Sequence, residues 1–239
     1  MNRSLSSRFT MDMSSELYQV AMLVDRLKHE EEAKRVDASQ HLVRIAKALG
    51  PERTREELIP FLSNSTGDED SVLVVIAEKL GELVDCVGGT QYLHLLLEPL
   101  EPLVAIDDST VRTAAVTSAE AVATAMDSTQ LNEHFIPCVL KLAGKEWFTS
   151  RISAATLAPI AYIRAEGTSA KSLAQAFLRL CADDTPMVRR VAAAQISKIA
   201  ASDVRKGGSF THHSSTASRL LDTALHLADD EQDSVRIQA

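Results

Sequence analysis

Two adjacent histidines, His212 and His213, are the residues of this sequence that most resemble metal ligands. A zinc site needs three or four protein ligands, and no third ligand lies at a suitable spacing around the pair. We therefore predict no metal site. The three cysteines, Cys86, Cys138 and Cys181, are too far apart for a CxxC site and odd in number. They fit small buried apolar side chains in a reducing compartment better than a disulfide framework.

Catalytic and nucleotide-binding motifs are absent from the sequence. None of the patterns GxGxxG, GxxxxGK[ST], GxSxG and HExxH occurs, although each would mark a defined phosphate-binding, nucleophilic or metal-dependent site. Serine, histidine and carboxylate residues show no local pairing that resembles a catalytic group. We predict that the chain is not an enzyme and binds no cofactor.

The composition favours an all-helical protein. Of the 239 residues, 45% are hydrophobic and only 4% are aromatic, which suits close-packed helices better than sheets. The net charge is −8 and the basic residues are scattered, so no stripe of Lys and Arg exists to bind nucleic acid. The sequence contains neither a transmembrane run nor a signal peptide. We therefore expect no membrane segment and a cytoplasmic protein, with the nucleus left open as a further location.

Three prolines inside apolar runs mark an internal repeat. Pro60, Pro99 and Pro137 follow one another at intervals of 39 and 38 residues, and a period of this size is typical of helical solenoids. A second apolar helix is predicted after each proline, and the same phase continues once more. The predicted starts of these second helices are Leu73, Arg112, Ser150 and Arg189.

A short acidic or polar turn precedes each predicted second helix. Such turns provide N-caps and favourable charge at a helix N-terminus. A Val or Thr follows the turn, and then usually an Arg, as at Val188 and Arg189. The pattern Asp…Val-Arg is typical of HEAT repeats, in which Asp and Arg side chains form a ladder between neighbouring units. The turns are residues 67–70, 107–110, 145–148, 183–186 and 229–233.

The sequence therefore predicts an all-α fold, an α-α superhelix of the HEAT-repeat solenoid type. Each amphipathic helix pair buries its apolar face against the neighbouring pair, so stacking makes the core. The last unit breaks off inside its second helix, and we expect the chain to be part of a longer protein. The expected parts are a disordered leader over 1–15, units over 16–50, 51–88, 89–127, 128–165 and 166–202, an inserted loop over 203–215, and an incomplete sixth unit over 216–239.

Five segments go beyond a generic repeat. In order and spacing they resemble the scaffold (A) subunit family of protein phosphatase 2A, and the likeness corresponds to the N-terminal portion of that family. The segments are Leu49–Leu58, Val87–Tyr92, Glu146–Arg151, Asp183–Arg190 and Asp230–Arg236.

The resemblance implies a non-catalytic scaffold of a serine/threonine phosphatase holoenzyme. In this family the N-terminal repeats bind interchangeable regulatory subunits through the ridge of inter-helix turns, and the last repeats, absent from this chain, bind the catalytic subunit. This chain departs from the family at Ser71, where an acidic residue is usual, and in its longer loop at 205–215. The residues that match family contacts are Asp107, Asp108, Trp147, Phe148, Asp184, Thr185, Pro186, Met187 and Arg190.

These residues also have purely structural interpretations. Trp147, the only tryptophan, can wedge adjacent turns together or serve as an interface anchor. An acidic turn residue can cap a helix, Asp184 can belong only to the ladder, and Pro186 suits the first turn of a helix. We keep Asp107 and Asp108 as contact residues because a doubled acid exceeds what one cap requires.

The alternative function is a HEAT or armadillo-type adaptor that binds other protein partners on its concave face. Carriers of that kind usually repeat Trp and Asn positions on the inner helices. This sequence has a single Trp, in a turn.

Overall fold

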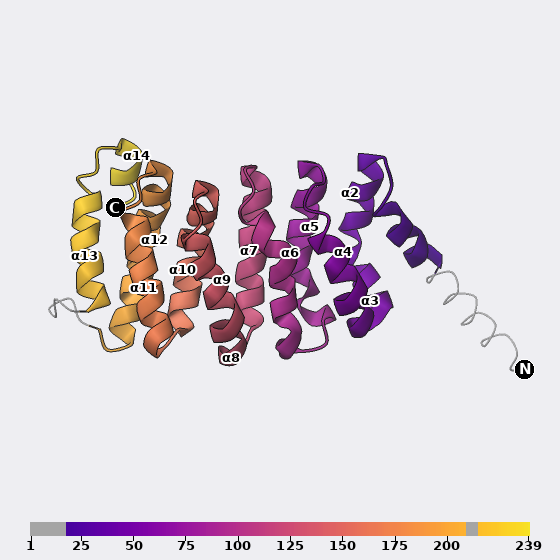
Figure 1. The fold of residues 1–239 in the computed structure, drawn as a ribbon, viewed down its shortest axis with the longest axis horizontal. Helices are drawn as coiled ribbons and strands as arrows, with labels where there is room; N and C mark the ends of the chain where they lie inside the picture. Colours follow the sequence, from indigo (N-terminus) through magenta and orange to yellow (C-terminus); the bar gives the residue numbers. More distant parts are fainter. Residues whose placement is uncertain (1–17, 209–214) are drawn as a thin grey trace, which may run out of the picture.

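The computed structural model describes residues 18–208 and 215–239. Figure 1 shows these residues as one elongated row of helices, in the order of the chain. Every regular element among them is helical, which confirms the predicted all-α solenoid. None of the described helices combines the length and the apolar character needed to cross a membrane. The expected leader over 1–15 and the pair His212 and His213 lie outside the described residues.

The helices form pairs, each with a first and a second helix joined by a short turn. A kink at Gly50, whose φ of 78° suits glycine, divides α3 between the first and the second pair. The first helices are 18–26; the end of α3 with η1 (Thr54–Leu58) and α4 (Ile59–Ser63); η3 (Thr90–Leu96) with α6 (Leu97–Leu103); α8 (Ser128–Gln130), η4 (Leu131–Phe135) and α9 (Ile136–Ala143); α11 (Gly167–Cys181); and α13 (Thr216–Leu227). The second helices are α2 (Glu32–Gln40) with most of α3 (Leu42–Arg53); α5 (Asp70–Glu82) with η2 (Leu83–Cys86); α7 (Ser109–Ala125); α10 (Phe148–Arg164); α12 (Pro186–Arg205); and α14 (Asp233–Arg236). The division into units at the boundaries given above remains a prediction.

The second helices begin two or three residues before the predicted positions. The first two residues of each of these helices are polar or only partly buried, so the apolar period becomes visible only after them. The predicted capping occurs at α7, where the Asp108 carboxylate accepts hydrogen bonds from the backbone N–H of Thr110 and Val111, both at 2.9 Å. No side chain caps α5, α12 or α14, so the acidic turns there have another role. The observed starts are Asp70, Ser109, Phe148 and Pro186, where the sequence predicted Leu73, Arg112, Ser150 and Arg189.

The three prolines that mark the repeat each follow a stretch of helix that is not α-helical. Pro60 and Pro137 lie in the first turns of α4 and α9, directly after the π-helical turns η1 and η4. Pro99 follows the 3₁₀ segment η3. Proline removes one N–H donor and clashes with the carbonyl four residues earlier in an α-helix. A local change of helical pitch moves that carbonyl away, and the period alone could not predict this.

The second helices stack on one another in one layer, and the first helices stack in another. In the second-helix layer, α5 and α7 approach closely where Gly81 faces Ser118. A Cβ atom on Gly81 would lie 2.7 Å from the Ser118 Oγ, and that hydroxyl donates to the Ala77 carbonyl of α5 at 2.6 Å. The buried core is one continuous cluster from Val20 to Val235. Each pair is therefore stabilised mainly by its neighbours.

The beginning of the predicted inserted loop belongs to the packed structure. Helix α12 continues three residues into the loop expected over 203–215. The Tyr162 hydroxyl donates to the Asp203 carboxylate at 2.6 Å. The Lys206 ammonium donates to the carbonyls of Tyr162 and Ala165 at the end of α10, where the helix dipole favours a cation. These contacts hold the end of α12 against α10, which explains why the helix is longer than predicted.

Candidate functional site, a ridge of inter-helix turns

The turns that join the two helices of each pair lie along one long edge of the molecule, the upper edge in Figure 1. We name this edge the turn ridge. All nine contact residues predicted from the sequence lie in these turns or in the first two turns of the helix that follows. The turns are residues 27–31, 64–69, 104–108, 144–147, 182–185 and 228–232.

Arginines near the start of three of the second helices each connect their own turn to the next one. The Nε and Nη2 atoms of Arg151 donate to the Asp183 carboxylate of the next pair at 2.7 and 3.0 Å. Its Nη1 donates to two carbonyls of its own turn. Arg189 repeats this arrangement with Asp230, again at 2.7 and 3.0 Å. A bidentate ion pair of this kind fixes both position and orientation, so one guanidinium holds two turns in register.

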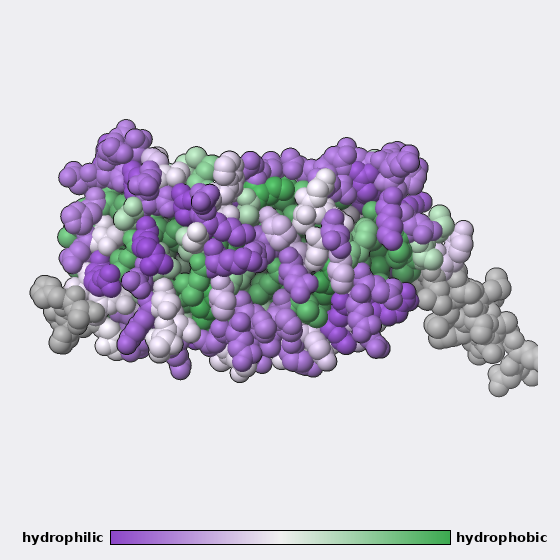
Figure 2. Space-filling view, viewed as in Figure 1, coloured by the Kyte–Doolittle hydropathy of each residue, from purple (hydrophilic) through white to green (hydrophobic). Residues whose placement is uncertain are grey.

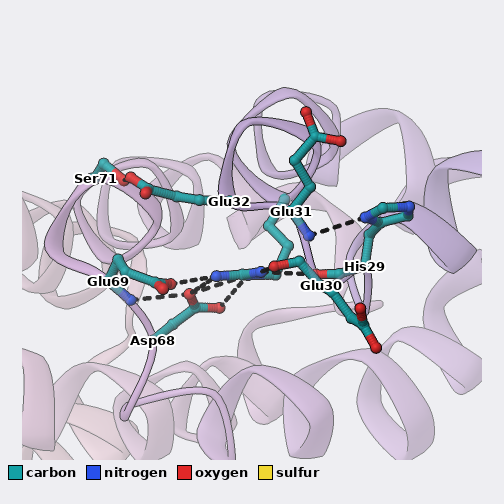
Figure 3. A network of polar contacts seen from close by, with 8 residues as sticks. His29, Glu30, Glu31, Glu32, Asp68, Glu69 and Ser71 are labelled. Atoms are coloured by element: carbon teal, nitrogen blue, oxygen red, sulfur yellow. Dashed lines mark hydrogen bonds and ion pairs between the residues drawn. The ribbon is translucent and has the colours of Figure 1, made fainter.

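Figure 3 shows the same arrangement between the first two pairs. The Nε of Arg35 lies 3.1 Å from both carboxylate oxygens of Asp68, and its Nη1 donates to two carbonyls of its own turn at 2.7 and 2.9 Å. The Ser71 hydroxyl donates to the Glu32 carboxylate. The serine therefore also links these two pairs.

The carboxylates of this ladder are almost buried. The side chains of Asp183 and Asp230 are 10% and 9% exposed. Burial raises the pKa of Asp183, but hydrogen bonds from its arginine partner and from backbone N–H outweigh burial and hold that pKa below its ordinary value. The arginine partner of Asp230 lowers its pKa in the same way. The acidic turns of the second, fifth and sixth pairs thus provide ion pairs between helix pairs, not the caps expected, and the ladder acid of the fifth pair is Asp183 instead of Asp184.

Trp147 is exposed and yet held in place. It is the last residue before α10, and its indole N–H donates to the Asp107 carboxylate at 2.8 Å, which bridges the turns of the third and fourth pairs. The ring is tilted against Phe148, with 6.0 Å between the ring centroids. Trp147 remains 55% exposed. It is therefore both a bridge between turns and an exposed apolar side chain.

The fifth pair adds polar and apolar groups to the same ridge. The Thr185 hydroxyl accepts a hydrogen bond from the ladder arginine of the fourth pair at 3.2 Å. Pro186 is the first residue of α12, where its missing N–H loses no helical hydrogen bond. Met187 is 49% exposed, and Asp184 and Arg190 are exposed as well. Figure 2 shows mostly hydrophilic residues along this edge, with hydrophobic residues visible between them and in the middle of the molecule.

The structure offers no metal site in the part of the chain that it describes. Among residues 18–208 and 215–239, no three His, Cys, Asp or Glu side chains are grouped closely enough to hold a metal ion. Cys86 and Cys181 are buried and Cys138 is half-buried, in agreement with their interpretation as small apolar side chains. Burial raises the pKa of Cys181 to about 12, so this thiol stays protonated and unreactive at neutral pH.

Two buried hydroxyl contacts between the third and fourth pairs were not predicted. The Thr149 hydroxyl donates to the Ala105 carbonyl and the Ser153 hydroxyl to the Val104 carbonyl, both at 2.6 Å. A helical Thr or Ser can equally bond the backbone of its own preceding turn. The sequence therefore contains no signal that these hydroxyls reach across to the neighbouring pair.

Known proteins similar to this chain include components of a phosphatase. The chain is 43% identical over 229 residues to the regulatory A subunit of protein phosphatase PP2A from Schizosaccharomyces pombe, with 95% of this chain and 38% of that protein covered. It is also 43% identical over 221 residues to a probable PP2A regulatory subunit from Caenorhabditis elegans, with 92% of this chain and 36% of that protein covered. The chain thus spans less than two fifths of the length of these relatives. No family model matches the chain.

Solved structures support the fold alone. A chain from a study of tubulin recruitment by microtubule polymerases with TOG domain arrays superposes with a TM-score of 0.58 at 13% sequence identity. The superposition covers 85% of this chain and 45% of that one. At so low an identity, the shared feature is the helical solenoid and not a shared partner.

Proposed function

The chain is a homologue of the N-terminal portion of the regulatory A subunit of protein phosphatase 2A, and from this premise we propose that it is a non-catalytic scaffold of a phosphatase 2A holoenzyme. The turn ridge docks regulatory subunits, and repeats outside this chain bind the catalytic subunit. The same proposal includes a location in the cytoplasm, with the nucleus as a further candidate location.

The observation that supports this role best is the state of Trp147. Its indole N–H is already bonded to Asp107, so the ring has little freedom to lose when a partner covers it. Met187, on the next pair, is also half-exposed. Large apolar side chains on a polar ridge are typical interface anchors. Phe148, Asp184, Thr185, Pro186 and Arg190 lie beside them, and we propose that they complete the contact surface together with Asp108.

The exposed part of Trp147 sets the size of the expected effect. An aromatic side chain buries up to about 250 Å², and 55% of Trp147 is still open. Covering that part removes roughly 140 Å² from water, which is worth about 3 kcal/mol at 25 cal/mol per Å². Trp147→Ala should therefore weaken binding of a phosphatase 2A regulatory subunit by about 2 kcal/mol or more, which is at least roughly 30-fold in Kd.

The test measures affinity and folding stability on the same variants. Ile163→Ala is the matched control, because Ile163 is also a half-exposed apolar residue but lies near the end of α10, far from the turn that holds Trp147. Leu80→Ala is the stability control, because Leu80 is fully buried and its truncation costs about 2–5 kcal/mol. Trp147→Ala should lower the affinity and leave the urea midpoint much closer to wild type than Leu80→Ala does. Unchanged affinity with a large midpoint drop would make Trp147 a structural wedge only.

A further inference from the structure

One rung of the arginine ladder is open. We call the place of Arg35, Arg151 and Arg189 in their second helices the ladder position. At the ladder position of the third pair, Arg112 donates from Nη1 to the carbonyls of Ile106 and Asp107 at 2.7 and 3.0 Å. These bonds match the own-turn bonds of Arg35, Arg151 and Arg189, so the guanidinium has the same anchor. Unlike those three, Arg112 forms no ion pair with any carboxylate among the described residues.

Arg112 lacks an acidic partner because one residue of the fourth pair differs in type from the ladder acids. The ladder acids Asp68, Asp183 and Asp230 each lie six residues before the ladder position of their own pair. In the fourth pair that place is occupied by Lys145, whose ammonium lies 3.2 Å from the Glu101 carboxylate. The Nε and Nη2 edge of Arg112, which corresponds to the acid-binding edge of the other arginines, therefore has no carboxylate to bind.

The neighbouring gap in the ladder is different. Between the second and third pairs both ladder positions are apolar, Val74 and Ile106, and both pack against the core. No charge is left without a partner there. Among the ladder positions that are followed by another pair in the described residues, only Arg112 keeps the cation and lacks the acid.

Arg112 lies next to the proposed anchor of the turn ridge. The carbonyl of Asp107 accepts from Arg112 at 3.0 Å, and the carboxylate of the same Asp107 accepts from Trp147. One turn residue thus positions both side chains. A partner segment that covers the indole can reach the guanidinium with an adjacent side chain.

From this arrangement we infer that Arg112 is a docking point for an acidic side chain of the regulatory subunit, which is the partner that follows from the proposed function. The carboxylate takes the place that Asp183 occupies on Arg151, and it completes the ladder from outside the chain. Nearby acids do not prevent this. Asp230 binds Arg189 although Asp229 lies beside it in sequence, and Glu231 lies 3.5 Å from the same guanidinium.

The test uses three variants and measures how tightly each binds one phosphatase 2A regulatory subunit. The first variant, Arg112→Met, removes the cation and keeps the aliphatic stem, and should weaken binding at least tenfold. Lys145→Asp supplies the missing acid from within the chain, so it should occupy Arg112, raise the urea midpoint and also weaken binding at least tenfold. Lys145→Ala removes the same bond to Glu101 without supplying an acid to Arg112, so its affinity for the regulatory subunit should stay within threefold of wild type.

The outcomes separate this inference from the proposed function. If Trp147→Ala weakens binding but Arg112→Met does not, the partner docks on the ridge but the inference about Arg112 is wrong. If Lys145→Asp binds as well as Lys145→Ala, an internal acid does not compete with the partner and the inference is equally wrong. If the wild-type chain does not bind a regulatory subunit, the proposed function fails first. A folded Lys145→Asp chain keeps the test decisive even if Arg112→Met is unstable.

Discussion

Replacing Arg151 by Met should destabilise the solenoid far more than the same change at Arg112. Arg151 and its partner Asp183 are 17% and 10% exposed. Removing one member of a nearly buried ion pair leaves an uncompensated charge, which costs about 3–5 kcal/mol. Some water still reaches the pair, so we expect about 3 kcal/mol. Arg112 has only its two carbonyl bonds to lose, worth about 1 kcal/mol where water can replace the donor.

Urea unfolding followed by circular dichroism measures this difference. With a slope of about 3 kcal/mol per M, at the upper end for small proteins, Arg151→Met should lower the midpoint by about 1 M and Arg112→Met by less than half of that. Equal midpoint shifts for the two variants would refute the reasoning, because they would show that the bonds within each turn, and not the ion pair between turns, stabilise the stack.

Two more predictions concern the ladder and the helix packing. Since the pKa values of Asp183 and Asp230 are lower in the folded chain than in the unfolded chain, their stabilising contribution is present above about pH 4 and is lost as the pH falls below it. The urea midpoint of wild type should therefore approach that of Arg151→Met as the pH falls below about 4, and a constant gap would contradict this. Gly81→Ala should destabilise the chain by about 1–3 kcal/mol in the same assay, because its Cβ would lie 2.7 Å from Ser118 Oγ. Gly144→Ala, whose Cβ would meet only two backbone carbonyl oxygens at 3.7 Å, should be nearly neutral, and equal effects of the two changes would exclude overpacking between α5 and α7.

The sequence predicted the repeat and the location of the turns because both depend on local patterns. The spacing of Pro60, Pro99 and Pro137 and the apolar period of the helices report features that a single pair specifies by itself. The acidic turns were found for the same reason. Their role as caps was wrong at most positions, because whether an Asp bonds its own helix or the next pair depends on how the pairs stack.

The choice between two adjacent acids shows most clearly what the sequence alone cannot predict. Asp183 and Asp184 are chemically identical neighbours, and the turn geometry alone directs Asp183 towards Arg151 and leaves Asp184 exposed. The open rung at Arg112 could have been found by comparing the residue six positions before each ladder site, where Lys145 stands instead of Asp. That comparison requires the ladder geometry, which became available only from the structure.

The contacts along the ridge imply that the proposed docking surface forms only when several pairs are stacked. Asp107 of the third pair holds Trp147 of the fourth, and Arg151 of the fourth pair holds Thr185 of the fifth. No single pair contains both members of either contact, so an isolated pair would present these side chains without fixed positions. Because stability in such a stack is a sum over pairs and interfaces, a change in a buried residue between the third and fifth pairs should loosen the anchors before the whole chain unfolds. Binding by this ridge is therefore coupled to the integrity of the interfaces beneath it.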